Sequence, residues 1–275
     1  MPTAITTTTI GTARRPNEPD RNLAMTYCVG LLLDAGLVMI ADTRTNAGVD
    51  NFSSYRKLHT LAETPERQIY VCTSGSLSMT QSVIGLLSEA LPAPVGDETA
   101  LSVATAPSMF QVAQLVSDAV QTVNRTVGAA LAEASIAGSV SLLLGGRIGD
   151  EPPSLYLVYS ASNFIRCSPE SPFLQIGETK YGKPILDRGI RHSTPLDEAV
   201  KVAFLSFDSA MRSNLGVARP LDLMVMPADP GRPILSRRIE PDDSYFNDLS
   251  LRWGAMLHDA TAAIPNPPWM EGEGG

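Results

Sequence analysis

Basic residues are scarce in this sequence, which has 21 lysines and arginines against 29 aspartates and glutamates and a formal net charge of −8 at pH 7. A protein that neutralises nucleic-acid phosphates needs a basic face, and none is visible here. A nucleic-acid partner is therefore not expected. No apolar run reaches the length that spans a bilayer, so membrane insertion is not expected either.

Cysteine and histidine are equally scarce, with three residues of each. The cysteines are odd in number and irregularly spaced in apolar segments, which favours buried free thiols in a reducing compartment over disulfides. The histidines lie far apart without ligand spacing, so neither a zinc site nor any other metal or cofactor is predicted. Because the N-terminal segment also lacks the apolar core of a secretion signal, we expect a cytoplasmic protein.

What the sequence does contain is enough apolar residues for one large core, since 44% of its 275 residues are hydrophobic. We expect a single domain over residues 26–259. The segment 1–25 is rich in Thr, Pro and Arg, and the segment 260–275 is rich in Pro, Gly and Glu; both are predicted to be disordered. Two further interpretations of the first segment are an upstream mis-start and a propeptide that caps the domain until assembly.

The stretch from Met25 to Leu33 carries the strongest chemical signal. A threonine hydroxyl is a poor nucleophile unless a base takes its proton, and a free α-amino group titrates at about pH 8. Thr26 would carry both groups as the first residue of a mature chain. Translation from Met25 with methionine removal would expose it, and so would cleavage before Thr26. The threonines at 6–9 are not followed by a buried strand and do not compete.

An acidic side chain follows Thr26 at hairpin distance. Residues 26–33 are predicted to form a buried strand and residues 37–41 the returning strand, joined by a tight turn. Antiparallel pairing of the two strands brings Asp42 back beside Thr26.

A lysine completes the set. Beyond a polar loop at 43–54, residues 55–58 are predicted to form a short strand that includes Lys57. A lysine held by Asp42 near the hydroxyl and the amine of Thr26 lowers the pKa of both groups by like-charge repulsion.

Three segments resemble a known family. They are Met-Thr-Tyr-Cys-Val at 25–29, Ala-Asp-Thr-Arg-Thr-Asn-Ala-Gly-Val-Asp at 41–50 and Ser-Tyr-Arg-Lys at 54–57. Together they resemble Anbu, the bacterial proteasome-related ancestral beta subunit, in the proteasome β-subunit and HslV group of N-terminal nucleophile hydrolases. The resemblance runs from Thr26 to about Met226. It implies a four-layer α-β-β-α sandwich of two antiparallel sheets, where periodicity alone predicts only an α+β fold.

The resemblance also assigns roles at the next strand-to-helix junction. A predicted strand at 67–73 leads into a helix through a glycine turn, which presents backbone N–H groups as an oxyanion hole requires. The family carries its oxyanion glycine and the start of its S1 pocket here, which implies Gly75 and Leu77. Taken alone, the local sequence indicates an ordinary turn.

Three weaker candidates come from the same resemblance. Proteasome subunits brace the nucleophile with an Asp and a Ser near a helix end; Ser213 matches the serine, and Asp208 matches the acid only approximately, with a solvated helix residue as the alternative. Glu178 stands where proteasome subunits have a serine that supports the terminal amine. There it would either raise the pKa of that amine or point to solvent from a helix start.

No catalytic or binding role is assigned to the remaining sequence patterns. Residues 177–183 fit the G-x-x-x-x-G-K spacing of a phosphate loop, but Pro184 replaces the Ser or Thr that would bind magnesium. Amphipathic helices are predicted at 109–131 and from 194 to about 213, and both belong to the core. A short aromatic helix at 245–257 is expected to pack on the domain or on a neighbouring subunit.

These observations predict a threonine-type peptidase or amide hydrolase. Two alternatives stay open: a small-amide amidase on the same fold, and a catalytically silent ring-forming subunit. The resemblance implies self-association into a ring or an open ring-like assembly, and it leaves open whether an unfoldase feeds the site.

Overall fold

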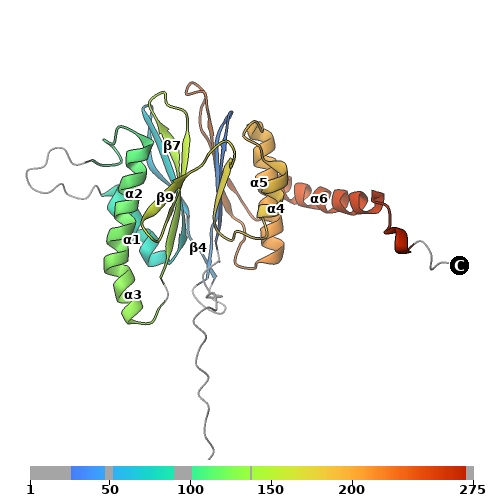
Figure 1. The fold of residues 1–275 in the computed structure, drawn as a ribbon, viewed down its shortest axis with the longest axis horizontal. Helices are drawn as coiled ribbons and strands as arrows, with labels where there is room; N and C mark the ends of the chain where they lie inside the picture. The colour runs from blue at the N-terminus through green and yellow to red at the C-terminus, as the bar shows by residue number, and fades with distance from the viewer. Residues whose placement is uncertain (1–25, 47–51, 90–100, 137, 271–275) are drawn as a thin grey trace, which may run out of the picture.

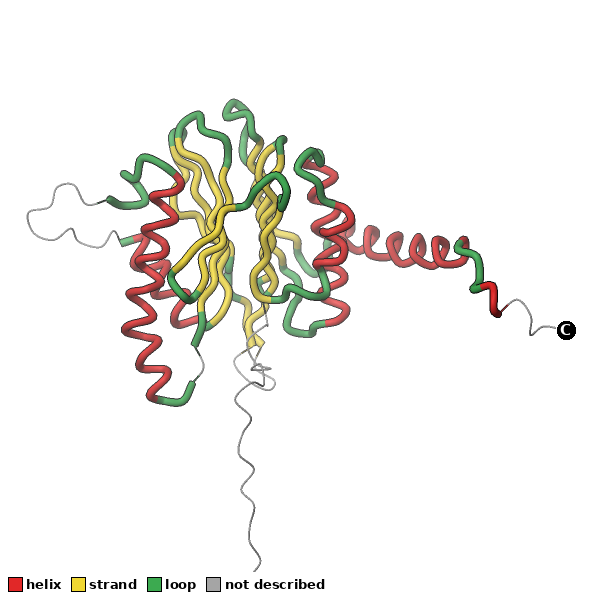
Figure 2. The backbone as a smooth tube through the Cα atoms, viewed as in Figure 1, coloured by secondary structure: helices red, strands yellow, loops and turns green. Residues whose placement is uncertain are grey.

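Two five-stranded antiparallel sheets stack face to face, and helices cover the outer face of each (Figure 1). The tube view shows the same four layers edge-on (Figure 2). The structure is a computed structural model that describes residues 26–46, 52–89, 101–136 and 138–270. The four-layer sandwich implied by the family resemblance is confirmed. The expected N-terminal extension lies outside the described residues.

The first sheet carries both chain segments of the predicted hairpin. In order across the sheet it consists of β10 (Phe173–Gly177), β1 (Tyr27–Leu33), β2 (Gly36–Asp42), β11 (Leu221–Pro227) and β12 (Leu235–Ile239).

The second sheet follows the sequence order of its strands. It consists of β5 (Leu58–Thr64), β6 (Arg67–Gly75), β7 (Val140–Ile148), β8 (Ser154–Tyr159) and β9 (Asn163–Arg166). A separate two-stranded ribbon pairs β3 (Arg44–Asn46) with β4 (Phe52–Ser54).

The helices form the outer layers. The second sheet is covered by α1 (Leu77–Ser88), α2 (Met109–Val123), a π-helical turn (Asn124–Gly128) and α3 (Ala129–Glu133); the first sheet is covered by α4 (Lys183–Gly189) and α5 (Leu196–Ser213). The last helix, α6 (Ser244–Ala263), projects away from the sandwich and is followed by a 3₁₀ turn (Pro268–Met270). No helix in the described part of the chain is long and apolar enough to cross a membrane.

Burial on both faces explains why the first strand reads as an unbroken apolar run. Along β1, Tyr27, Val29 and Leu31 pack toward the helices, whereas Cys28 and Leu32 pack against the second sheet. The first sheet therefore lies between two hydrophobic cores. All three cysteines are buried with free thiols.

Three predictions of local structure are wrong. The polar loop at 43–54 contains the β3–β4 ribbon, which carries no apolar alternation and so leaves no strand signal in the sequence. Lys57 lies between β4 and β5, outside any strand. Residues 260–263, expected in a disordered tail, are the last turn of α6, where three alanines favour helix.

Candidate active site

Thr26 directly precedes β1 and is buried, with 8% of its surface exposed. Its carbonyl oxygen accepts the N–H of Glu178 at 2.6 Å, just beyond the partner strand β10. Gly177 makes this approach feasible, because its φ is +79° and a Cβ there would lie 2.0 Å from the Thr26 oxygen. The main chain of Thr26 is therefore fixed on the β10 side.

Asp42, the last residue of β2, reaches the peptide that follows Thr26. Its Oδ1 atom accepts the N–H of Tyr27 at 2.9 Å. Its Oδ2 atom accepts the N–H of Arg44 at 3.1 Å, where the chain leaves the sheet. The predicted hairpin pairing thus brings the carboxylate to the Thr26 end of the sheet.

Lys57 binds the same carboxylate. Its Nζ donates to Oδ1 of Asp42 at 2.9 Å and to the carbonyl oxygen of Arg44. Complete burial raises the pKa of the Asp42 carboxyl to about 6, although the Lys57 ammonium and the donated N–H groups oppose that rise. The N–H of Thr73 in β6 donates to the Lys57 carbonyl at 2.9 Å, so the second sheet holds the lysine in place without a strand around it.

The end of β6 adjoins the same region. A Cβ on Gly177 would lie 3.1 Å from Oγ of Ser74, a buried residue that the sequence analysis missed. Gly75 has a φ of +116°, and a Cβ there would lie 2.1 Å from the carbonyl oxygen of Ser139. Only glycine fits this turn. Leu77 is half-buried at the first position of α1.

Glu178 is buried, which excludes the alternative that it points to solvent. Its Oε1 atom accepts the N–H groups of Lys180 at 2.6 Å and Tyr181 at 3.2 Å. Its Oε2 atom accepts Nδ2 of Asn214 at 3.0 Å. The carboxylate thus caps the turn before α4 and binds the end of α5. Asn214 gave no signal in the sequence, since nothing local links it to Glu178.

Ser213 and Asp208 take no part in these contacts. Among the described residues, no hydrogen bond or ion pair joins either side chain to the candidate nucleophile or its two charged neighbours. Ser213 is exposed at the end of α5. Asp208 is buried, not solvated as expected: it accepts the hydroxyl of Ser250 at 2.7 Å and Nε of Arg212 at 2.9 Å, and so links α5 to α6.

A buried hydroxyl chain anchors the residue next to Thr26. The Tyr27 hydroxyl accepts Nε2 of Gln175 at 2.6 Å and lies 2.7 Å from Oγ of Ser206. Since Ser206 gives its hydrogen to the carbonyl oxygen of Gly182 at 2.8 Å, Tyr27 donates to Ser206. Burial raises the pKa of the Tyr27 phenol well above its usual range. The chain ties β1 to α5 at the position after the candidate nucleophile.

Several solved structures similar to this chain are of Anbu proteins. The Anbu complex of Pseudomonas aeruginosa, solved as a helical assembly, matches with a TM-score of 0.80 and 42% identity over 88% of this chain and 98% of that one. The chain belongs to the Anbu family. Anbu from Hyphomicrobium sp. strain MC1 matches at 0.78 and 40%, and Anbu (ancestral beta-subunit) from Yersinia bercovieri at 0.77 and 37%; each covers 88% of this chain and 99% of the other. No protein-family model and no curated protein matches the chain.

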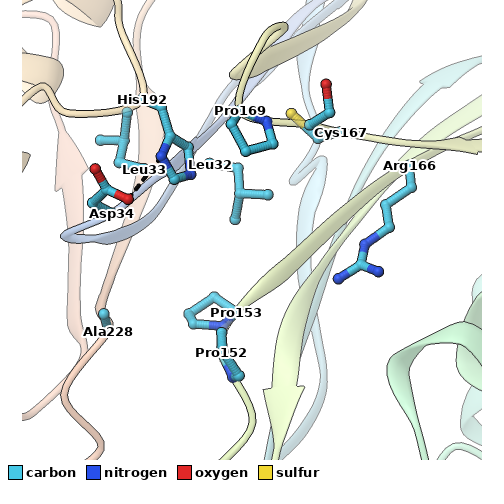
Figure 3. Close-up of a pocket in the computed structure, with 11 residues that line it drawn as sticks. Leu32, Leu33, Asp34, Pro152, Pro153, Arg166, Cys167, Pro169, His192 and Ala228 are labelled. Carbon is cyan, nitrogen blue, oxygen red and sulfur yellow. Dashed lines mark ion pairs between the residues drawn. The ribbon is translucent and has the colours of Figure 1, made fainter.

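A hollow of about 430 Å³ lies at the opposite end of β1 in this Anbu chain (Figure 3). Its wall includes Asp34, whose carboxylate pairs with Nδ1 of His192 at 2.8 Å. The Cys167 thiol also lines it, but burial raises the pKa of this thiol to about 12, which keeps it protonated near neutral pH. The hollow therefore offers no activated thiol, and the Thr26 end is the candidate active site. No group of three or more His, Cys, Asp or Glu suited to a metal ion occurs in the part of the chain described.

Proposed function

We propose that this Anbu protein is a threonine-type hydrolase of peptide or amide bonds, with Thr26 as its nucleophile. The observation that carries the proposal is the shared oxygen of Asp42, which accepts the Tyr27 N–H and the Lys57 ammonium at 2.9 Å each. This oxygen ties a buried positive charge to the peptide directly behind Thr26. An N-terminal threonine benefits from such a charge, because it lowers the pKa of the hydroxyl that must lose its proton.

Acylation is the first half of the reaction. Oγ1 of Thr26 attacks the substrate carbonyl carbon while the α-amine of the mature chain accepts the hydroxyl proton. Backbone N–H groups at the β6–α1 junction, with that of Gly75, stabilise the oxyanion that forms. The protonated amine then gives its proton to the leaving nitrogen as the C–N bond breaks. The acyl group stays on Thr26 as an ester, and Leu77 begins the pocket for the side chain before the cleaved bond.

Deacylation repeats the same proton transfers. The α-amine takes a proton from water, the resulting hydroxide attacks the ester carbon, and the proton returns to Oγ1 as the carboxylic acid leaves. Lys57 remains charged and paired with Asp42 throughout. Because the cleaved bond is an amide in either case, this chemistry serves a peptidase and a small-amide amidase equally. Parallel profiling of peptide and small-amide libraries separates the two.

A covalent probe tests the nucleophile. A chain made to start at Thr26, by cleavage of a fusion partner, is incubated with a β-lactone or an epoxyketone and its adduct is located by mass spectrometry. We expect the adduct on Thr26, none in Thr26→Ala, and an unchanged adduct in the control Thr60→Ala, whose residue is exposed on β5. An adduct elsewhere, with hydrolysis surviving Thr26→Ala, would overturn the proposal. A purified native chain that keeps residues ahead of Thr26 supports the silent-subunit alternative.

We also infer that the protein self-associates, as the helical assembly of the Pseudomonas relative suggests. The projecting helix α6 supports this inference. Its side chains Leu251, Met256 and Leu257 are 74%, 64% and 47% exposed. Large apolar side chains gathered on a helix that leaves the domain are typical of a protein contact surface.

A further inference from the structure

Glu178 is a buried carboxylate without a cation. Only 5% of its surface is exposed, and it takes part in none of the ion pairs among the described residues. Its three hydrogen bonds come from two backbone N–H groups and one amide, which are all neutral. A buried charge is costly unless an opposite charge compensates it. The site therefore has a negative charge in excess.

The orientation of Asn214 keeps that carboxylate an acceptor. Oδ1 of Asn214 accepts the N–H of Gly216 at 2.9 Å, and this contact identifies which end of the amide is oxygen. Nδ2 then faces Glu178 and can only donate to it, at 3.0 Å. Asn214 follows directly on α5, so the helix fixes the position of the Glu178 side chain from the outer layer.

The main chain of Glu178 lies beside Thr26, the residue that would carry the proposed amine. The N–H of Glu178 donates to the carbonyl oxygen of Thr26 at 2.6 Å. Thr26 and Glu178 stand directly beyond Tyr27 and Gly177, the last paired residues of β1 and β10. Removal of the residues before Thr26 would therefore create a positive charge next to an uncompensated negative one.

We propose that Glu178 is the counter-ion of the α-ammonium group of mature Thr26 and that Asn214 holds it there. The inference rests on the proposed function in one respect, since it requires Thr26 to become the first residue. Glu178 acts through the amine and is a positioning residue. It stabilises the protonated amine, so the amine becomes a free base only at a higher pH than an ordinary α-amine.

Other charges near the amine do not cancel this effect. Asp42 on β2 and Lys57 ahead of β5 face the same point and neutralise each other as an ion pair. The guanidinium of Arg44 donates to the carbonyl oxygen of Leu215. The Tyr27 phenol and the Cys28 thiol both have pKa values raised by burial and stay neutral. Of the two carboxylates in this set, Asp42 has a cationic partner and Glu178 takes part in no ion pair among the described residues.

Competitive acetylation measures the pKa of the amine without requiring catalysis. The chain starting at Thr26 is treated with trace acetic anhydride across pH 6 to 10, and acetylation of the N-terminal peptide is quantified by mass spectrometry. An ordinary α-amine has a pKa of about 7.7 to 8.0. We expect the wild-type amine to titrate above this range and Glu178→Gln to lower its pKa by about one unit, which is a tenfold change in the protonation equilibrium.

Matched variants distinguish the effect of the Glu178 charge on the amine pKa from a general effect of removing a buried side-chain contact. Asp208→Asn removes another buried carboxylate, which binds Arg212 and Ser250 instead of the site, and is expected to leave the amine pKa unchanged. Glu178→Asp keeps the charge and should retain part of the elevated pKa. Asn214→Ala frees the carboxylate and should lower the amine pKa by less than Glu178→Gln does. If Glu178→Gln does not fold, the wild-type value and Asn214→Ala decide the question.

Two results would overturn the counter-ion role: a wild-type amine with an ordinary pKa, or equal pKa changes in Glu178→Gln and Asp208→Asn. Failure of the proposed function looks different. In that case no electrophile adduct forms on Thr26, whatever the amine pKa. An adduct on Thr26 combined with an unresponsive amine would retain the hydrolase and remove Glu178 from it.

Discussion

Lys57 and Asp42 form an ion pair of 2.9 Å in which the side chains are only 7% and 0% exposed. A second lysine–aspartate pair, Lys183 with Asp187 at 2.6 Å, has side chains 49% and 48% exposed. Similar contact distances therefore occur in two different environments. The sequence shows only that each pair consists of two opposite charges. The structure shows that the first pair is buried, and burial makes the loss of one partner costly.

Removing the buried lysine should be far more damaging than removing the exposed one. Lys57→Met leaves the Asp42 carboxylate buried without a cation, which typically costs about 3–5 kcal/mol of unfolding free energy. Lys183→Met breaks a solvated pair and should cost less than about 1 kcal/mol. Urea denaturation measures both. Acylation by the β-lactone should slow by about tenfold or more only in Lys57→Met, since one unit of pKa is a tenfold effect. Equal losses of stability would contradict this account.

Gly75→Ala should destabilise the β6–α1 junction. Its φ of +116° disfavours any side chain, and the new Cβ would lie 2.1 Å from a backbone oxygen that cannot move aside. We expect a loss of about 1–3 kcal/mol. The control is Gly85→Ala in the middle of α1, where a Cβ meets nothing within 4 Å. That variant should gain about 0.5–1 kcal/mol from helix propensity. Thermal unfolding of both variants checks the opposite signs.

Asp42 should make the protein less stable as the pH rises from 4 to 6. Its carboxyl has a pKa of about 6 in the folded chain against 3.8 as the reference value. The folded state therefore binds the proton more tightly than the unfolded state in this window, and the slope of unfolding free energy against pH is negative. The difference of about 2 units corresponds to an effect on the order of 3 kcal/mol.

Asp42→Asn isolates that contribution. The free energy of unfolding is measured from pH 3.5 to 7 for both proteins, and the wild-type curve should fall relative to the variant between pH 4 and 6. The acylation rate should move in the other direction, since protonation of Asp42 below about pH 6 removes the partner of Lys57. Parallel stability curves would show that the carboxyl titrates normally.

Tyr27→Phe should loosen the position next to the proposed nucleophile. The change leaves the amide of Gln175 without its buried acceptor and takes the donor from Ser206, at a typical cost of about 1–3 kcal/mol. A double-mutant cycle with Ser206→Ala should give a coupling energy of about 0.5 kcal/mol or more. The exposed Tyr245→Phe is the control and should be neutral. Additive losses in the cycle would mean that the hydroxyl chain is not cooperative.

Charges on α6 should dissociate the assembly without unfolding the subunit. Leu251→Asp and Met256→Asp place carboxylates on side chains that are 74% and 64% exposed, so the domain loses no core contact. Sedimentation velocity should then show smaller species at unchanged melting temperature. Leu215→Asp, at a residue 80% exposed outside α6, serves as the control. Assemblies that resist both α6 changes would place the contact elsewhere.

Local pattern was sufficient for the hairpin half of the site. The apolar runs around a tight turn predicted β1 and β2, and the pairing carried Asp42 to Thr26 because a short turn fixes the register. The prediction that Asp42 holds Lys57 is confirmed, but Lys57 does not lie in the strand that was predicted for it. A hydrogen bond from Thr73 in the other sheet positions it instead, and no pattern near Lys57 announces that contact.

The residue at the end of α5 that binds Glu178 could not be predicted from local pattern. The sequence pointed to Ser213 at the helix end, but the next residue, Asn214, is the one that binds Glu178. Which side of a helix end faces the site depends on how α5 packs on its sheet, and a shift of one residue turns a side chain by about 100°.

The amino-acid sequence by itself determined the family and, through that resemblance, the sandwich, because both depend on residue identity; strand periodicity and one short turn determined the hairpin that carries Asp42. Only the tertiary structure decided that Glu178 is buried, that Asn214 holds it and that Asp208 serves α6. These outcomes follow from contacts between segments far apart in the chain, where the stacking of layers determines which charges lose their water and which neighbours they then require.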